Sequence, residues 1–175
     1  MDNKADHSYQ ANHYDIIIAG AGCAGLSLLY SILQSPILST QKILVIDKSF
    51  EKSNDRTWCF WETHNGKFDA LVCKKWNQIS VHKNEFSATL PTNPFTYKMV
   101  EGIDFYKHII DFAKQFTNVH WQEAYISSID TINEEAIVHW EGGAAHGNKV
   151  FSSILPIDDL YVISQSKQST PFLWQ

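Results

Sequence analysis

The sequence predicts an α/β fold built on a parallel sheet, and three observations lead to this prediction. A short β-branched run at residues 14–19 stops at a glycine, an amphipathic segment follows at 24–33, and a second β-branched run occupies 42–47. Apolar runs this short are typical of strands that are buried on both faces. A strand, a helix and a strand in this order form a right-handed crossover unit, so we expect the two strands to lie parallel.

Each of these first elements has its own boundary signal. Apolar residues recur at helical spacing through 24–33, and Pro36 closes that segment. A polar link at 39–41 separates the helix from the second strand. Before Tyr14 the chain is polar and aperiodic, so we expect residues 1–13 to form a flexible arm and residues 14–175 to form one domain.

The size and composition of the chain fit this single domain. It has 175 residues, of which 44% are hydrophobic and 19% are charged, a balance typical of globular rather than disordered proteins. At a usual length of about 150 residues per domain, two full domains are not expected. The formal net charge of −5 provides no field that attracts phosphate backbones, which argues against nucleic-acid binding.

The alternation of elements continues in the second half of the chain. Residues 104–116 carry an amphipathic apolar stripe and predict a helix, with Asp104 placed to favour its N-terminal end. Residues 119–125 then predict a third parallel strand, because an α/β chain returns to its sheet after a helix. Two weakly alternating runs at 77–83 and 86–90 predict an inserted antiparallel hairpin.

Antiparallel strands are expected towards the end of the chain. Alternation predicts them at 129–132, 136–140 and 149–154. We expect a turn at Gly142-Gly143 and a loop near Gly147-Asn148. Because residues 170–175 are apolar and aromatic, we also expect the chain to be one part of a longer protein and the fold to be truncated.

The cysteines, histidines and apolar runs restrict compartment and metal binding. The three cysteines, Cys23, Cys59 and Cys73, lack close C-x-x-C spacing, which favours a reducing compartment. The eight histidines are scattered, so no metal site is expected. The N-terminus is too polar for a signal peptide, and glycines interrupt the apolar run at 14–33. We therefore expect a cytoplasmic protein without a membrane-spanning helix.

One glycine-rich segment carries the strongest functional signal. The pattern G-x-G-x-x-G is matched by Gly20, Ala21, Gly22, Cys23, Ala24 and Gly25. It follows a predicted strand and opens a predicted helix, as a dinucleotide site requires. The first glycine permits a tight turn, the second leaves room for a pyrophosphate, and the third allows close helix–strand packing. Unpaired N–H groups at the helix N-terminus then face the phosphates. The segment predicts a Rossmann-type dinucleotide-binding domain.

A carboxylate lies where such a domain binds the ribose. Asp47 ends the second predicted strand, 22 residues beyond Gly25. It favours a ribose with a free 2′-hydroxyl, as in FAD or NAD, over the 2′-phosphate of NADP. The motif does not separate FAD from NAD. Cys23 lies at the predicted helix N-terminus, which lowers thiol pKa values, but packing is the role we expect for it.

A second informative segment is aromatic and lies after the second strand. Its residues are Arg56, Thr57, Trp58, Cys59, Phe60 and Trp61. Aromatic rings beside an arginine can cover an apolar ligand while the guanidinium binds a phosphate or ribityl chain. The alternative is a buried structural segment, and the pattern alone does not decide between a strand and a loop.

Together these segments resemble the bacterial lycopene β-cyclases, a family of FAD-binding proteins with a Rossmann-type domain. The resemblance lies in residues 14–25, 44–47 and 54–62, with weaker support from 97–106 and 172–175. The first two segments are shared with many flavoproteins, whereas Arg-Thr-Trp-Cys-Phe-Trp at this distance from Asp47 is more particular to the cyclases. The chain resembles the N-terminal half of such an enzyme.

The resemblance implies a redox-neutral reaction in carotenoid biosynthesis. The acyclic ends of lycopene would close to β-ionone rings, giving β-carotene, by proton addition, cyclisation of the carbocation and proton loss. Bound reduced FAD is implied as an electrostatic stabiliser or proton source, with NAD(P)H as the source of its electrons. Because lycopene dissolves in membranes, peripheral contact with the inner face of the cell membrane is also implied. The catalytic residues are implied to lie beyond Gln175.

The same resemblance suggests roles for individual residues. The glycine segment would bind the pyrophosphate and Asp47 the adenosine ribose. Arg56 would make a second cofactor contact, because an arginine soon after the second strand can reach the pyrophosphate or ribityl chain. The substrate-proximal residues would be Thr57, Trp58, Phe60 and Trp61.

Two other functions remain open from the sequence. The same nucleotide fold could belong to an FAD-dependent oxidoreductase, such as an aromatic-ring monooxygenase or a polyprenyl reductase, since fold does not fix function. The chain could also be a non-catalytic fragment that binds a nucleotide.

Overall fold

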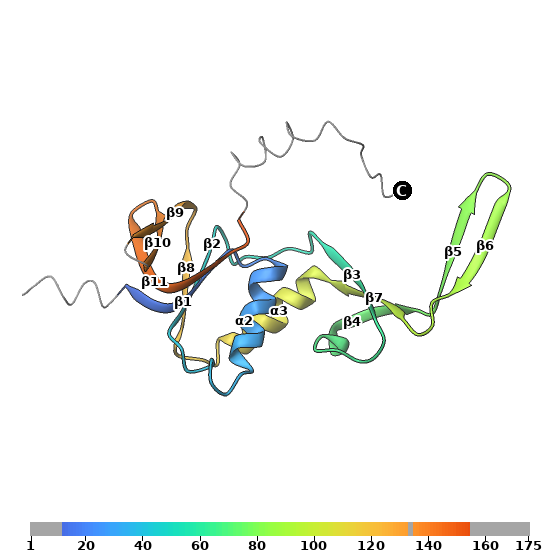
Figure 1. Cartoon of the computed structure of the whole chain (residues 1–175), viewed down its shortest axis with the longest axis horizontal. Helices are drawn as coiled ribbons and strands as arrows, with labels where there is room; N and C mark the ends of the chain where they lie inside the picture. Colours follow the sequence, from blue (N-terminus) through green and yellow to red (C-terminus); the bar gives the residue numbers. More distant parts are fainter. Residues whose placement is uncertain (1–11, 133–134, 155–175) are drawn as a thin grey trace, which may run out of the picture.

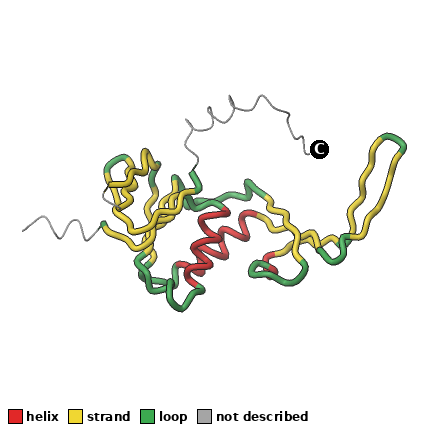
Figure 2. Tube along the Cα trace, viewed as in Figure 1, coloured by secondary structure: helices red, strands yellow, loops and turns green. Residues whose placement is uncertain are grey.

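A computed structural model describes residues 12–132 and 135–154 of the chain. Its largest unit is a six-stranded sheet with the strand order β8-β2-β1-β11-β10-β9. The strands are β1 (His13–Ala19), β2 (Ile43–Asp47), β8 (Val119–Glu123), β9 (Ile126–Ile132), β10 (Glu135–Trp140) and β11 (Gly143–Ser152). Two helices, α2 (Cys23–Leu33) and α3 (Gly102–Ala113), lie side by side in the middle of the molecule (Figures 1 and 2). Most of the predicted arm at 1–13 and the aromatic residues at 170–175 lie outside the described residues.

The sheet contains the predicted parallel unit. β1 pairs in parallel with both β2 and β11, and β2 pairs in parallel with β8. The parallel strands β1, β2, β8 and β11 are the first to fourth in chain order. Across the sheet they lie in the order 3-2-1-4, as in a Rossmann fold. The predicted α/β fold and its parallel strands at 14–19, 42–47 and 119–125 are confirmed.

The last strand differs from the prediction in two ways. β11 runs without interruption through Gly147 and Asn148, where the sequence predicts a loop. It pairs antiparallel with β10 from Gly143 to Gly147 and parallel with β1 from His146 to Ser152. The prediction of an antiparallel strand at 149–154 was therefore wrong, because local alternation identifies a strand but not its partner. A Cβ at Gly147 would press on Ile17 of β1, so close strand packing explains this glycine.

Both faces of the central strands are buried, as their apolar runs predict. Successive side chains of a strand point to opposite faces, and Ile16 and Ile18 pack with Leu29 of α2 and Ile109 of α3 in the larger core cluster. Ile17 instead belongs to a smaller cluster with Val138 and Ala145 of the antiparallel strands β10 and β11. The two helices thus share one face of the parallel sheet.

An antiparallel segment is inserted between β2 and α3, as predicted. Its elements are β3 (Thr57–Glu62), η1 (Asp69–Leu71), β4 (Val72–Trp76), β5 (Gln78–Lys83), β6 (Phe86–Pro91) and β7 (Thr96–Glu101). They form a three-stranded sheet of order β3-β7-β4 and the predicted hairpin, β5-β6. The aromatic segment is therefore a strand. The second helix is confirmed, but it begins and ends slightly earlier than the predicted 104–116.

Within residues 12–132 and 135–154, no helix is both long enough and apolar enough to cross a membrane.

Candidate functional site

The carboxyl ends of the four parallel strands meet at one edge of the sheet. Gly20 follows β1, Asp47 ends β2, Ala124 follows β8 and Ser153 follows β11. Backbone bonds extend the pairing past the strands: the Ala124 N–H donates to the Asp47 carbonyl and the Ser153 N–H to the Ala19 carbonyl, each at 2.9 Å. A cleft of about 430 Å³ opens at this edge. Ligands of open α/β sheets bind at such carboxyl ends, where the strand order reverses.

The three motif glycines differ in what an added side chain would meet. Gly20 has a φ of +103°, which a side chain disfavours, and a Cβ there would also collide with the Ser153 hydroxyl. A Cβ at Gly25 would collide with the carbonyl oxygen of Gly20, so this glycine lets α2 approach the strand closely. A Cβ at Gly22 would meet nothing within 4 Å. Gly22 lines the cleft, and its missing side chain leaves that space open to a ligand.

The N-terminus of α2 is open to an anion. Gly22 is its N-cap residue, so no side chain caps the first N–H groups, and the first turn holds no acidic residue. The free N–H groups and the positive end of the helix dipole favour a negatively charged ligand. This matches the role that the sequence predicts for the segment.

Asp47 is held in place by three donors. Its Oδ2 accepts a hydrogen bond from the Ala21 N–H at 2.5 Å, and its Oδ1 accepts from the Ser49 N–H at 3.1 Å. The Lys52 ammonium forms an ion pair with the same Oδ1 at 3.1 Å. Asp47 therefore ties the glycine loop to the end of β2, a structural role in addition to the predicted ribose contact.

Arg56 reaches the same cleft from the chain segment after β2. It lines the cleft together with Gly20, Gly22 and Asp47. Its guanidinium is exposed, and its Nε lies 3.4 Å from the Asp55 carboxylate. The structure thus brings the predicted cofactor residues Gly20, Gly22, Asp47 and Arg56 together at one cleft, lined both by the N-cap glycine of α2 and by an exposed cation.

The variable positions of the motif face other surroundings. Ala21 is buried, and its N–H is bound by Asp47. Ala24 is exposed on α2. Cys23 lines an internal cavity of about 90 Å³ with Trp58 and Phe60. Burial raises the pKa of the Cys23 thiol, against a smaller lowering by its hydrogen bond with Ser27. The described environment favours packing over a reactive thiol.

The predicted substrate-proximal residues divide between the two faces of β3. Trp58 points to the helices, where its ring packs edge-on against Phe105 at 5.0 Å and Tyr106 at 5.3 Å. Phe60 also packs against the larger core cluster. Thr57 and Trp61 lie on the exposed face, where Trp61 stacks on Tyr97 at 4.5 Å. These four residues do not form one surface, and none of them lines the cleft.

The cleft also contains residues that sequence reasoning missed. They are Lys48, Ala124, Tyr125, Ile126, Ser153 and Ile154. The end of a third parallel strand is a signal that could have identified Tyr125. Ser153 and Ile154 could not be found in this way, because the strand before them was predicted as antiparallel.

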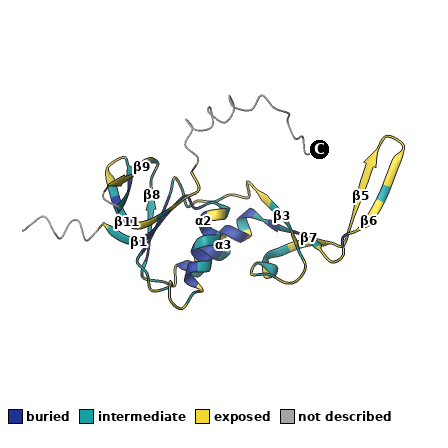
Figure 3. Ribbon diagram, in the orientation of Figure 1, coloured by how far each residue is buried: buried dark blue, intermediate teal, exposed yellow. Residues whose placement is uncertain are grey.

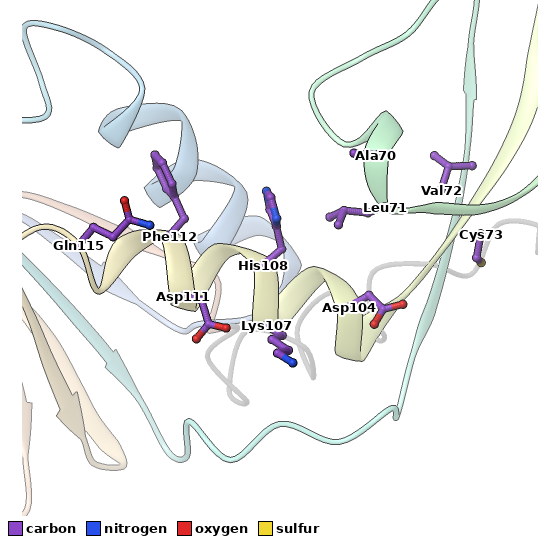
Figure 4. Close-up of a pocket in the computed structure, with 10 residues that line it drawn as sticks. All are labelled: Ala70, Leu71, Val72, Cys73, Asp104, Lys107, His108, Asp111, Phe112 and Gln115. Carbon is purple, nitrogen blue, oxygen red and sulfur yellow. The ribbon is translucent and has the colours of Figure 1, made fainter.

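A larger groove lies elsewhere in the molecule, along α3. It measures about 660 Å³ and separates the helix from η1 and β4. His108 lies with its ring 5.5 Å from that of Tyr30 of α2, whereas Lys107 and Asp111 point to the opposite side of α3 (Figure 4). The groove contains none of the predicted site residues and no carboxyl end of a parallel strand. Among the described residues, no three His, Cys, Asp or Glu side chains are placed to bind a metal ion, here or elsewhere.

Comparison with known families gives one match that covers most of the chain. A family model described as lycopene cyclase protein matches residues 15–154. This range includes the glycine loop, Asp47, Arg56 and both inserted sheets. A search of curated protein sequences gives no significant match.

The solved structures with a similar fold include monooxygenases and a halogenase. PqsL, a probable FAD-dependent monooxygenase from Pseudomonas aeruginosa, has a TM-score of 0.62 at 11% identity, over 79% of this chain and 42% of that chain. The p-nitrophenol 4-monooxygenase PnpA from Pseudomonas putida DLL-E4 has a TM-score of 0.60 at 11% identity, over 81% of this chain and 41% of that chain. The halogenase PltM has a TM-score of 0.59 at 13% identity, over 85% of this chain and 36% of that chain. The chain thus shares their fold and spans about two fifths of their length.

Proposed function

The chain belongs to the lycopene cyclase protein family, and on that premise we propose that it is the FAD-binding part of a lycopene β-cyclase. The proposed reaction closes the acyclic ends of lycopene to β-ionone rings without net oxidation or reduction. The observation that carries the proposal is the cleft at the parallel strand ends, where Gly20, Gly22, Asp47 and Arg56 converge. The proposed location is cytoplasmic, with peripheral contact to the inner face of the cell membrane.

The residues at the cleft fit the adenosine diphosphate part of FAD. The open space at Gly22 and the uncapped N-terminus of α2 suit a pyrophosphate. Asp47 lies next to that loop and retains lone pairs that a ribose diol can use as acceptors. Arg56 supplies a cation on the cleft wall, where it can bind a phosphate or polar chain oxygen.

Reduced FAD would supply an electron-rich ring that stabilises positive charge, or a proton, with NAD(P)H as the source of its electrons. The residues of this chain would bind and orient the cofactor. They also hold its site in shape, because Asp47 fixes the loop backbone while Lys52 neutralises the carboxylate. Proton transfer to the hydrocarbon is proposed to depend on residues beyond Gln175.

The direct test is to identify the small molecule that the chain binds. The purified 175-residue chain is denatured, and the released compound is analysed by visible spectrum and chromatography. We expect FAD, and we expect Arg56→Ala to weaken rebinding of FAD while leaving the circular dichroism spectrum unchanged. A folded chain that neither contains nor binds FAD would contradict the proposal. The full-length enzyme should then convert lycopene to β-carotene without a change in mass.

A second candidate is an FAD-dependent monooxygenase, which is favoured by the described activities of PqsL and PnpA. Both candidates predict bound FAD, so the product must separate them. A monooxygenase consumes NAD(P)H and oxygen in proportion to product and adds oxygen to its substrate. A cyclase forms an isomer of the substrate and leaves the oxygen concentration unchanged.

A further inference from the structure

The β5-β6 hairpin projects from the molecule, away from the central sheet and the helices (Figure 1). Both of its strands are almost entirely exposed (Figure 3). Among the described residues, β5 and β6 form a separate two-stranded sheet and pair only with each other. Two-stranded hairpins are marginally stable in water unless something packs on them, so a partner for this one is expected.

The hairpin has one apolar face and one polar face. In its register, Ile79 lies opposite Leu90 and Val81 opposite Ala88, so their side chains share a face. We call this face, with Phe86 at its outer end, the apolar hairpin face. Its largest side chain, Phe86, is 60% exposed. On the other face, hydrogen bonds of 2.9 Å join the side chains of two cross-strand pairs, Ser80 with Thr89 and His82 with Ser87.

The apolar hairpin face continues onto an aromatic surface at its base. Ile79 and Leu90 line a hollow of about 510 Å³ together with Trp61 and Phe95. Beyond Trp61, the ring of Tyr97 lies 4.5 Å from that of Trp61 and 5.6 Å from that of Trp76. Aliphatic and phenylalanine side chains thus occupy the projecting part, and tryptophan and tyrosine lie at its base. This is the distribution found where a protein enters a membrane interface.

The charge of this region is opposite to that of the whole chain. Residues 72–91 contain three lysines, Lys74, Lys75 and Lys83, and one acidic residue, Glu85. Lys75 forms an ion pair with Asp69 just before this range, so residues 69–91 together have a formal charge of +1. The complete chain has a formal net charge of −5. Lys83 lies opposite Phe86 at the outer end of the hairpin, where its long side chain can reach headgroups while its stem stays on the apolar face. The region is therefore complementary to an anionic lipid surface.

We propose that the β5-β6 hairpin docks the protein onto an anionic phospholipid bilayer by inserting the apolar hairpin face into its interface. The aromatic surface at the base would lie at headgroup level, and the polar face would stay in water. The inference deepens the proposed function, on which it rests for the choice of a bilayer rather than a soluble protein as partner. It assigns the membrane contact to one element and one face.

The test is flotation of the 175-residue chain with phosphatidylcholine vesicles that contain phosphatidylglycerol. We expect the chain to float with them, and the double variant V81D/F86D to lose on the order of tenfold in partitioning, because two apolar side chains leave the interface. The matched control is S80D/S87D, which adds the same charge to the polar face and should float nearly as well as the unchanged chain. Circular dichroism confirms that both variants fold.

Hydrogen exchange locates the contact independently of mutation. We expect vesicles to slow amide exchange in residues 78–91 and to leave that of α2 unchanged. The proposal is overturned if the chain does not float, if both double variants float equally, or if residues 78–91 gain no protection. A concentration-dependent dimer that only V81D/F86D abolishes, without vesicle binding, would assign the face to a second copy instead.

The flavin experiment distinguishes failure of this inference from failure of the proposed function. Vesicle binding by a chain that does not bind FAD would leave the docking surface valid and contradict the cyclase proposal. FAD binding by a chain that does not bind vesicles would leave the proposed function valid and contradict the docking inference.

Discussion

Asp47 has a structural role at the edge of the cleft and, in the proposed function, a second role in binding the ribose. Its carboxylate holds the Ala21 N–H and an ion pair with Lys52, and both side chains are largely shielded from water. A ribose diol must therefore use a lone pair that these contacts leave available, or displace the ammonium. The residue is expected to affect both folding stability and cofactor affinity, and variants can separate these effects.

We expect Asp47→Ala to weaken FAD binding by about 1 to 3 kcal/mol, because polar groups of the ribose and loop are left unpaired. The thermal midpoint should also fall, since Ala21 and Lys52 lose their partner. Lys52→Met is the comparison, because it removes the ion pair and keeps the carboxylate. Titration with FAD and thermal unfolding measure the two effects. Equal FAD affinities for Asp47→Ala and the unchanged chain would mean that Asp47 only supports the loop.

Gly22→Val is expected to abolish FAD binding while the chain still folds. The added side chain has room within the protein but occupies the space proposed for the pyrophosphate. Gly25→Val is the contrasting variant, because its Cβ collides with the Gly20 carbonyl and should destabilise the fold itself. Circular dichroism and flavin titration check both variants. Normal flavin content in folded Gly22→Val would refute the loop assignment.

At the scale of elements, a buried lysine joins β7 to the segment after β3. The Lys98 ammonium donates to the Glu62 carboxylate at 2.8 Å, to the Asp69 carboxylate at 2.6 Å and to the His64 carbonyl at 3.1 Å. All three of its donors are thus used, and its side chain is only 3% exposed. The cluster fixes the segment that leads to η1, beneath the core face of the small sheet.

This cluster should make stability depend on pH at the acid end. Hydrogen bonds from Lys98, and then Lys75, hold the pKa of Asp69 below its ordinary 3.8. As the pH falls, the unfolded chain therefore binds a proton at Asp69 before the folded chain does. The stabilisation from Asp69 is complete above pH 3.8 and is lost at lower pH. The hydrogen bond with Asp69 also raises the pKa of Lys98 above 10.5, so its contribution persists up to that pH and is lost above it.

We expect Asp69→Asn to lower the urea midpoint at neutral pH and to flatten its decline below about pH 4, because the shifted carboxyl is gone. The control is Asp111→Asn, which changes an exposed carboxylate paired with Lys114. Exposed pairs of this kind contribute little, so the acid decline should persist in the control. Identical acid profiles for Asp69→Asn and the unchanged chain would argue against the role of this cluster.

At the scale of the whole molecule, β11 joins the parallel and antiparallel parts of the central sheet. It pairs with β1 on one side and β10 on the other. It also brings Ser153 and Ile154 to the cleft. Without β11, β1 would expose a long apolar edge, which favours aggregation.

Two truncations test this dependence. A chain that ends at Ile154 keeps every strand described for the sheet and is expected to stay folded and monomeric. A chain that ends at Gly142 lacks β11 and is expected to aggregate. Size-exclusion chromatography measures both outcomes. A monomeric, folded chain ending at Gly142 would show that β11 is dispensable.

The sequence alone determined the first βαβ unit, its glycine loop and the inserted hairpin. These are local features: β-branched runs at 14–19 and 42–47, helical spacing between them, and glycines where the backbone turns sharply or where α2 approaches β1 closely. The family resemblance on residues 54–62 likewise followed from local order and is confirmed by the match over 15–154.

Only the tertiary structure decided which strands pair and which side chains meet. The alternation of residues 143–152 fits either orientation, and the position between β1 and β10 is chosen by burial of Ile17, Val138 and Ala145 in one cluster. The same limit applies to β3, whose aromatic residues share a segment but not a surface. Trp58 and Phe60 pack on the helices while Trp61 faces outward, because side-chain direction along a strand has meaning only once one face is covered.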